Sequence, residues 1–578
     1  MVLYKEGVLV AYFLKKSNLK KGQYLQIYES FYNPDKKQTA HRSHRAIGYV
    51  QDFVSSDMPD PIAHYSKVVH EMNEKLHQEK QRQKEQQISS SPEKHAGYFL
   101  LKAVFDRLQT SRYLDILQIS RDFQFRLTDL LEGLVYCRLI QPCSKSKTFQ
   151  EVLPSLYNAQ EFSYDQILDG IEFAGNEYEK VIEIFNHQLR LKYPTDTSTT
   201  YFDCTNFYFE IDQEDHFRKK GPSKENRNDP IVGMGLLLDA HQIPMGMKLY
   251  PGNESEKPVI REMIQDLKTR NSITGRTIQV ADKGLNCANN ILEARRNADG
   301  YIFSKSVKML PVKEKMWVLL ENDFHDVLDK NKKVLYRIKE CVDQFPYIYT
   351  DDKGKKVSVK ITEKRVVTFN PQLAKKKRIE INRMVEKAKT LKASQAKREE
   401  FGDCSKYVTF TPLDKNGNST DGKIAVSLND KAIEADWMLA GYNLLVTSEI
   451  NMSAKDVYSV YHNLWRIEES FRIMKSYLDA RPVYLQKMNS ICGHFLICYL
   501  SVLLLRILQF HVFKNQYSSE KLIGLIKNFR VVQVQNDMYI NMTAASDMIK
   551  EMANDLKLPL TNYFLNPSHL KKVLSLKL

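Results

Sequence analysis

The sequence lacks the features that mark zinc-scaffold, secreted or membrane proteins. It has eight cysteines in 578 residues, and none shows the paired spacing of metal ligands. Without a recognisable signal peptide, these thiols are expected to be reduced and mostly buried, as in a cytoplasmic protein. The apolar run at 8–14 is too short for a signal sequence, and a strand is expected there. The run at 495–505 is too short to span a bilayer, so we expect a core helix and no membrane partner.

An excess of acidic residues is also missing, because 85 lysines and arginines outnumber 70 aspartates and glutamates and give a formal charge of +15. Such a balance favours a polyanionic partner, since each cation placed on a phosphate releases counterions. Hydrophobic residues make up 43% of the chain, which is enough for substantial cores. The length predicts about three or four structural units.

The segment 460–475 is the most informative part of the chain. No glycine or proline interrupts it, and Ser453 or Asp456 is placed to cap a helix that continues through it. Four apolar residues recur at helical spacing and predict a buried stripe: Leu464, Ile467, Phe471 and Met474.

A polar row accompanies this stripe. Tyr461, Glu468 and Lys475 follow one another at intervals of seven, which places them on nearly the same helical face, and Arg472 lies four residues after Glu468. A carboxylate flanked by a phenol and two cations suits a site that handles metal ions and phosphate. The alternative is a surface row of intrahelical ion pairs.

A characteristic order of elements precedes this segment. Three strands, a helix and a further strand are expected at 199–211, 231–238, 243–250, 256–270 and 277–284. Antiparallel strands followed by a crossover helix and another strand begin an RNase H-like sheet, so we predict an α/β fold of that class. In that arrangement Asp203, in the middle of the first strand, and Asp282, at the end of the last, lie side by side.

Two carboxylates at neighbouring strand positions repel each other unless a cation lies between them. Oxygen-only ligands select hard ions, so Asp203, Asp282 and Glu468 are predicted to bind Mg²⁺ or Mn²⁺, with two ions expected. The alternative roles are a strand-end cap for Asp203 and a turn residue before Gly284 for Asp282.

These motifs resemble the signature of DDE transposases of bacterial insertion sequences, in the group with a Tyr-Arg-Glu-Lys pattern. Tyr461, Glu468 and Lys475 match that pattern, whereas Leu464 stands at the arginine position and Arg466 or Arg472 would have to replace it. Further matches, in the same order as in that group, are Asp203 with Thr205, Gly252-Asn253 with Glu256, and Asp282 with Gly284.

The resemblance covers about residues 196–510 and implies an RNase H-like catalytic domain. It implies metal-dependent cleavage of DNA at transposon ends and joining of those ends to target DNA, by a homodimer in the bacterial cytoplasm near the nucleoid. It also implies that Glu468, rather than the adjacent Glu469, is the third carboxylate. Tyr461, Arg472 and Lys475 are then expected to contact DNA.

The separation of 186 positions from Asp282 to Glu468 predicts an insertion. Strand-like runs at 332–338 and 347–361 indicate β structure, and the composition of 372–400 indicates a basic helix. Between residues 351 and 400 there are 16 basic and 7 acidic residues, an excess of +9. The group resembled carries a β-rich insertion here that touches the transposon end, so we expect DNA contacts from Lys375, Lys376, Lys377 and Arg378.

Two tryptophans lie in or near the insertion. Trp317 and Trp437 are expected to pack in a core, with stacking on an unpaired DNA base as the alternative.

The expected organisation begins with a β-rich module (1–65), a charged linker or helix (66–95) and a helical domain that is a candidate for DNA binding (96–195). The RNase H-like domain takes 196–300 and 440–515, around a β-rich insertion with a basic helix (301–439). A helical C-terminal region takes 516–578, and the resemblance implies that such a region contributes to dimerisation. Two alternatives to a transposase remain at this point: a DNA-binding descendant without catalysis, and an RNase H-like nuclease that does not transpose.

Overall fold

The computed structural model describes residues 9–33, 38–55, 58–90, 93–225, 227–270, 275–351, 353–393, 398–413, 423–534 and 538–578. Two compact units result. The N-terminal unit is Met1–Glu93 with Val532–Asn536, and the main unit is Lys94–Val531 with Asp537–Leu578.

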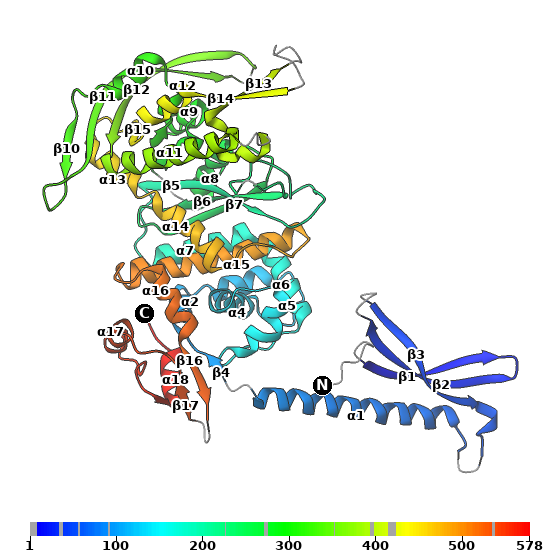
Figure 1. Ribbon diagram of the computed structural model, residues 1–578. Helices are drawn as coiled ribbons and strands as arrows, with labels where there is room; N and C mark the ends of the chain where they lie inside the picture. The colour runs from blue at the N-terminus through cyan, green and yellow to red at the C-terminus, as the bar shows by residue number, and fades with distance from the viewer. Residues whose placement is uncertain are drawn as a thin grey trace. The chain divides into compact units, whose positions relative to one another are not determined.

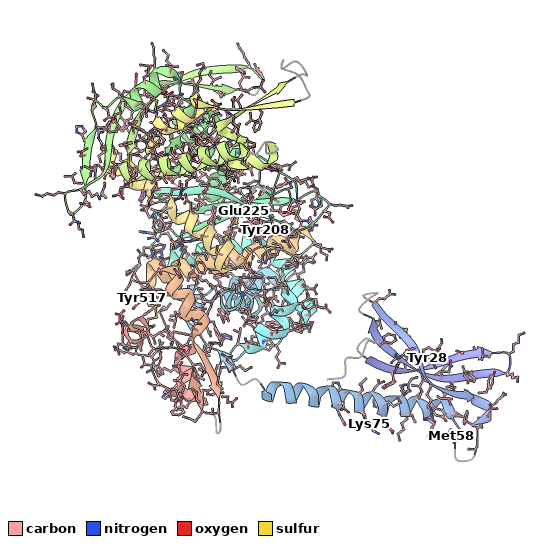
Figure 2. The ribbon with its side chains drawn as sticks, in the orientation of Figure 1. Tyr28, Met58, Lys75, Tyr208, Glu225 and Tyr517 are labelled. Carbon is pink, nitrogen blue, oxygen red and sulfur yellow. The ribbon has the colours of Figure 1, made fainter. Side chains whose placement is uncertain are left out.

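The N-terminal unit combines a three-stranded antiparallel sheet with one long helix. The strands are β1 (Leu9–Leu19), β2 (Gly22–Asn33) and β3 (Gln38–Tyr49), and the helix is α1 (Pro61–Ser90). The side chain of Asn73 fixes α1 to β1, because it accepts from Tyr12 N at 2.8 Å and donates to Tyr12 O at 2.9 Å. Tyr28 on β2 and Lys75 on α1 are labelled in Figure 2. The charged segment expected at 66–95 is largely helical, because α1 covers most of it.

The main unit contains a helical layer built around α15. Its other helices are α2 (Phe99–Leu108), α3 (Ser111–Gln118), α4 (Leu127–Ile140), α6 (Tyr164–Asn176) and α7 (Tyr178–Lys192). The helix α15 (Met488–Arg506) packs against α4 and α6 on one side and against β7 (Pro244–Pro251) of the main sheet on the other (Figure 1). Gly493 allows α15 to approach α6 closely, because a Cβ at this position would lie 2.0 Å from Ile171 O of α6.

The described residues include one helical stretch long and apolar enough to cross a membrane, Met488–Val512. Its most apolar window is entirely buried inside the protein. This agrees with the core helix that the short apolar run predicts.

The main sheet has nine strands in the order β10-β11-β12-β15-β9-β8-β5-β6-β7. The strands at one end are β5 (Thr199–Tyr208), β6 (Ile231–Leu238), β7, β8 (Ile278–Ala281) and β9 (Gly300–Lys305). β5, β6 and β7 are antiparallel neighbours, and α8 (Glu256–Arg270) carries the chain to β8, which pairs with β5 in parallel. The predicted order of three strands, a helix and a strand is thus confirmed.

The segment between β9 and β15 (Tyr442–Thr447) extends the same sheet. Its strands β10 (His325–Leu328), β11 (Val334–Thr350) and β12 (Lys356–Phe369) join the sheet through the antiparallel pairing of β12 with β15. The β structure expected at 332–338 and 347–361 is present, and a turn divides the second run between β11 and β12. Asp351 turns the chain there, since its carboxylate accepts from Lys353 N at 3.0 Å and from Lys355 N at 2.8 Å.

A smaller substructure follows β12. It consists of α11 (Pro371–Ala393), the 3₁₀ segment η6 (Arg398–Tyr407), the paired strands β13 (Val408–Leu413) and β14 (Lys423–Leu428), and α12 (Asp430–Met438). The apolar side chains of Ala388, Phe401, Cys404 and Val408 form a separate small core beneath α11.

The helix predicted as continuous through 460–475 is divided in three. α13 (Ala454–His462) is capped by Ser453, whose Oγ accepts from Asp456 N at 3.2 Å. α14 (Trp465–Arg472) follows and passes into the π-helical turn η7 (Ile473–Tyr477). At the break, Leu464 N bonds to Tyr461 O, three residues back, which tightens the turn and buries Leu464. All four residues of the predicted apolar stripe are buried, as expected.

The C-terminal region contains α16 (Ser519–Asn528), α17 (Asp547–Asp555) and α18 (Pro567–Leu574). It also contributes three short strands, β16 (Arg530–Gln533), β17 (Tyr539–Asn541) and β18 (Phe564–Leu565), to a four-stranded sheet with β4 (Glu93–His95). The purely helical expectation for 516–578 missed these strands because each is only two to four residues long.

Candidate active site

Two carboxylates meet where β5 and β8 run side by side. The parallel register pairs Phe202 with Ala281, so Asp203 and Asp282 are the next residues on the two strands. Asp203 lies within β5, whereas Asp282 follows the last residue of β8 and begins the 3₁₀ turn η4 (Lys283–Leu285). The sequence-based expectation that these two residues become neighbours agrees with this pairing.

Burial is the main cause that raises the pKa of Asp203 to about 6. The charge of Lys224 and the backbone N–H of Cys204 oppose this shift, while the negative charges of Asp282 and Glu256 add to it. The Cys204 bond measures 2.8 Å. A half-buried carboxyl group beside two other carboxylates has the electrostatic character of a cation ligand.

Tyr461 connects α13 to this pair. Its Oη donates a hydrogen bond to Asp282 Oδ1 at 3.0 Å, and burial together with the charge of Asp282 raises the pKa of the phenol. Tyr461 therefore orients the second carboxylate, a role that the sequence did not indicate. Its predicted contact with DNA phosphate stays a prediction.

Glu468 is exposed on α14 and belongs electrostatically to the same group. Partial burial raises its pKa, the charge of Asp282 adds to this shift, and Lys224 opposes it. Glu468 thus lies near enough to Asp282 and Lys224 to sense both. The same environment links it to Asp203, whose pKa responds to the same two groups.

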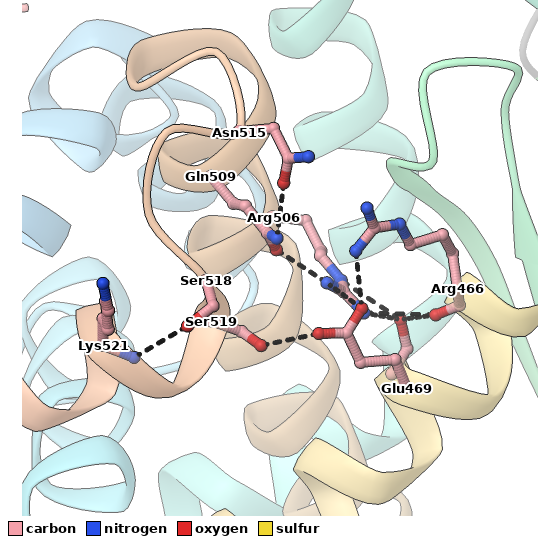
Figure 3. A network of polar contacts seen from close by, with 9 residues as sticks. Arg466, Glu469, Arg506, Gln509, Asn515, Ser518, Ser519 and Lys521 are labelled. Carbon is pink, nitrogen blue, oxygen red and sulfur yellow. Dashed lines mark hydrogen bonds and ion pairs between the residues drawn. The ribbon is translucent and has the colours of Figure 1, made fainter. Parts of the chain in front are cut away.

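The adjacent Glu469 has a different role (Figure 3). It is buried and accepts hydrogen bonds from Arg506 Nη1 at 3.1 Å, Arg466 Nη1 at 2.9 Å and Ser519 Oγ at 2.8 Å. Burial opposes its ionisation, but Arg506, Ser519 and Arg466 together lower the pKa of Glu469 below its usual value. Glu469 fastens α14 to α15 and α16, which supports the assignment of Glu468 to the candidate site.

Arg466 and Arg472 are the two proposed replacements for the signature arginine. Arg466 forms an ion pair with Glu469. Its guanidinium also lies over the Trp465 ring, 3.7 Å from the centroid. Arg472 is exposed at the end of α14, and its expected contact with DNA stays a prediction.

Lys475 reaches the site from η7. Its Nζ donates to Glu225 Oε1 at 3.1 Å. Burial lowers the pKa of Lys475 to about 8, and Lys224 lowers it as well, while the charge of Asp203 acts in the opposite direction. Glu225, a residue of the β5–β6 loop, therefore holds Lys475 close to Asp203.

A groove of about 800 Å³ opens beside Asp282 and Tyr461. Its basic lining residues are Lys283, Lys305, Lys308, Lys376 and Lys377. Two of the four cations predicted on the basic helix thus face the same groove as Asp282. Lys375 is exposed outside this lining, and Arg378 lies over the Trp437 ring at 5.5 Å.

The two tryptophans differ in exposure. Trp317 packs partly against the main core with Lys339 Nζ 5.0 Å from its ring centroid, whereas Trp437 is 37% exposed. Core packing therefore accounts for Trp317 better than for Trp437.

Within the described ranges, no three His, Cys, Asp or Glu side chains are arranged so that they could share one metal ion as they stand. The ligand role of Asp203, Asp282 and Glu468 therefore stays a prediction. The donor set itself, three carboxylates that are half-buried or exposed, fits a hard divalent cation.

Lys224 is a residue of the site that sequence reasoning missed. It lies in the polar loop between β5 and β6, pairs with Glu256 at 3.5 Å and donates to Cys204 O. It influences the pKa of Asp203, Glu468 and Lys475. No periodic or motif signal marks such a loop residue, because only the folded loop brings it to the site.

Comparison with known proteins places this geometry in a family. Residues 196–504 match the family described as the transposase DDE domain. Among solved structures, a piggyBac transposase synaptic complex with hairpin DNA is similar at 9% sequence identity and a TM-score of 0.33, over 83% of this chain and 84% of that one. A similarity of this size supports no conclusion about this chain. The comparison with curated proteins gave no match. Because the family match spans more than half of the sequence, the chain belongs to the transposase DDE domain family.

Proposed function

We propose that this protein binds the DNA at transposon ends and catalyses metal-dependent strand cleavage and strand transfer to target DNA. The observation that carries the proposal is the parallel β5–β8 pairing, which sets Asp203 and Asp282 on adjacent strands. Family membership supports a transposase function, and the basic groove beside Asp282 supports DNA as the partner.

In this proposal Asp203, Asp282 and Glu468 hold Mg²⁺ or Mn²⁺, with two ions expected. When bound, the ions supply activation of a water or 3′-hydroxyl and stabilisation of the leaving oxygen. The chain's own residues orient the ligands. Tyr461 fixes the rotamer of Asp282, and the backbone N–H of Cys204, which donates to Asp203 Oδ1, orients the carboxyl group of Asp203.

The DNA backbone would follow the groove that leads away from Asp282. Lys376 and Lys377 would contact phosphates from one wall, while Lys283 and Lys305 would do so from the other. Lys375 and Arg472, both exposed, would extend these contacts beyond the groove. We further propose that two copies act together on the two ends of one element, in the cytoplasm beside the nucleoid.

The test compares Asp203→Asn, Asp282→Asn and Glu468→Gln with the wild-type chain on a duplex carrying the inverted repeat that flanks the gene. Each variant is expected to bind the duplex in a gel shift yet to lose cleavage with Mg²⁺ and with Mn²⁺. Asp212→Asn, which changes an exposed residue in the β5–β6 loop, is the matched control and should retain cleavage.

The same assay separates the alternatives. A wild-type chain that binds the ends but never cuts them would indicate a DNA-binding descendant without catalysis. Cleavage without joining to a target duplex would indicate an RNase H-like nuclease.

A further inference from the structure

Glu225 lies in the loop that joins β5 to β6 and faces two cations beyond α14. Its Oε1 accepts from Lys475 Nζ at 3.1 Å and also contacts Arg481 Nη1. The Arg481 guanidinium lies over the ring of Tyr208, 5.2 Å from the centroid, and Tyr208 and Glu225 are both labelled in Figure 2. One carboxylate therefore compensates two positive charges, so that one remains in excess.

The loop holds Glu225 beside the strand that carries Asp203. Asn206 of β5 donates from Nδ2 to Pro222 O at 3.1 Å, and its Oδ1 accepts from Lys224 N at 3.3 Å. Two bonds from one side chain fix the loop immediately before Glu225. The carboxylate therefore lies at the catalytic centre because of the local fold and not through a chance surface contact.

The contact is open to competition. The side chains of Glu225, Arg481 and Lys475 are 26%, 22% and 15% exposed, so another anion can reach them. Among the described residues, Arg481 Nη1 is enclosed and has no hydrogen-bond partner of ordinary geometry, although it contacts Glu225. Partly exposed ion pairs contribute little stability, whereas a phosphate group offers additional acceptors to a guanidinium fork.

We propose that Lys475 and Arg481 form a phosphate-binding site for the DNA strand at the catalytic centre, and that Glu225 occupies this site as an internal competitor until a DNA phosphate displaces it. The inference rests on the proposed function and adds Arg481 and Glu225 to it. Glu225 then lowers the affinity of the protein for DNA, whatever the DNA sequence. Only DNA that is also held by other contacts enters the catalytic centre.

The first experiment measures the affinity of the full chain for a fluorescein-labelled duplex of random sequence, by anisotropy without divalent ions. Glu225→Gln is expected to bind roughly tenfold more tightly, the order of one charge-assisted interaction. Glu210→Gln is the matched control, because Glu210 pairs with Arg227 at 3.9 Å in the same loop and its replacement should leave the affinity unchanged. Arg481→Ala added to Glu225→Gln should remove most of the gain.

The second experiment does not depend on a change in the affinity for DNA. Acetylation of Lys475, followed by mass spectrometry, should be slow in the free wild-type chain and faster in Glu225→Gln, and the duplex should protect Lys475 in both. Glu225→Asp, which keeps the charge on a shorter side chain, should fall between them and serves if Glu225→Gln does not fold.

Unchanged or weaker binding of a folded Glu225→Gln, or unchanged Lys475 acetylation, would overturn the competitor role. Neither assay involves cleavage. A chain that shows both expected effects but never cuts end DNA would therefore refute the proposed function alone.

Discussion

Replacement of Glu469 by alanine should destabilise the protein far more than replacement of its neighbour Glu468. Glu469 compensates Arg506, whose side chain is 0% exposed, and also accepts from Arg466 and Ser519. Removal of one partner from a buried ion pair leaves an uncompensated charge and costs about 3–5 kcal/mol. Glu468 is exposed, so its replacement should change the free energy of unfolding by less than about 0.5 kcal/mol.

The assay monitors urea-induced unfolding by amide hydrogen exchange in α14, α15 and α16. A local probe is needed because a chain of this size does not unfold in two states. Glu469→Ala should lose exchange protection in these three helices together. Glu469→Gln, which keeps the shape and removes the charge, should lie between alanine and wild type.

The effect also has a pH dependence of known sign. Because the folded protein lowers the pKa of Glu469, its contribution is present above the unfolded value of about 4.3 and is lost as the pH falls through the lower folded value. The difference between wild type and Glu469→Gln should therefore shrink below about pH 4. A folded, fully stable Glu469→Ala without cleavage, beside an active Glu468→Ala, would show that the assigned register is wrong by one residue.

The site and its scaffold lead to three further predictions. With a pKa of about 8, Lys475 loses its charge as the pH rises, so DNA binding should weaken from pH 7 to 9, and Lys475→Arg should abolish that dependence. Replacing Lys376 and Lys377 by glutamine should weaken binding to end DNA. It should also reduce the slope of log affinity against log salt concentration by about 0.9 for each phosphate that is no longer neutralised. Gly493→Ala should destabilise by about 1–3 kcal/mol or more in urea unfolding, because its Cβ would meet a backbone oxygen at 2.0 Å.

The last two of these predictions have internal controls. Lys389 lies on the same basic helix as Lys376 but outside the lining of the groove, so Lys389→Gln should leave affinity and salt slope unchanged. Gly524→Ala has no heavy atom within 4 Å of its Cβ and should be neutral or stabilising. Unchanged affinity and salt slope in the Lys376/Lys377 variant would assign the basic helix to solvent.

The adjacency of Asp203 and Asp282 was predictable because local patterns specify it. Alternating apolar runs define the strands, and crossover connections have a preferred hand, so β8 returns beside β5. The buried face of α14 and η7 was predictable for the same reason, since apolar spacing reports burial directly.

Contacts between distant segments were not predictable from such patterns. Glu469 is partnered by Arg506, 37 residues away, and Glu225 by Lys475, 250 residues away. The break after His462 falls at Asn463, where tertiary packing buries Leu464, and no glycine or proline marks it in the sequence. The sequence therefore separates Glu468 from Glu469 by motif spacing alone, while the structure separates them by their partners.

The pairing of β12 with β15 has a consequence for how this protein tolerates shortening. β15 bonds to β9 on one side and to β12 on the other, with Lys364 opposite Thr447 and Phe369 opposite Tyr442. Removal of the segment between β9 and β15 would leave a row of unpaired backbone N–H and C=O groups along β15, whose side chains are largely apolar. Such an open edge invites pairing with other chains, so a shortened protein should self-associate into aggregates even if its carboxylates remained in place.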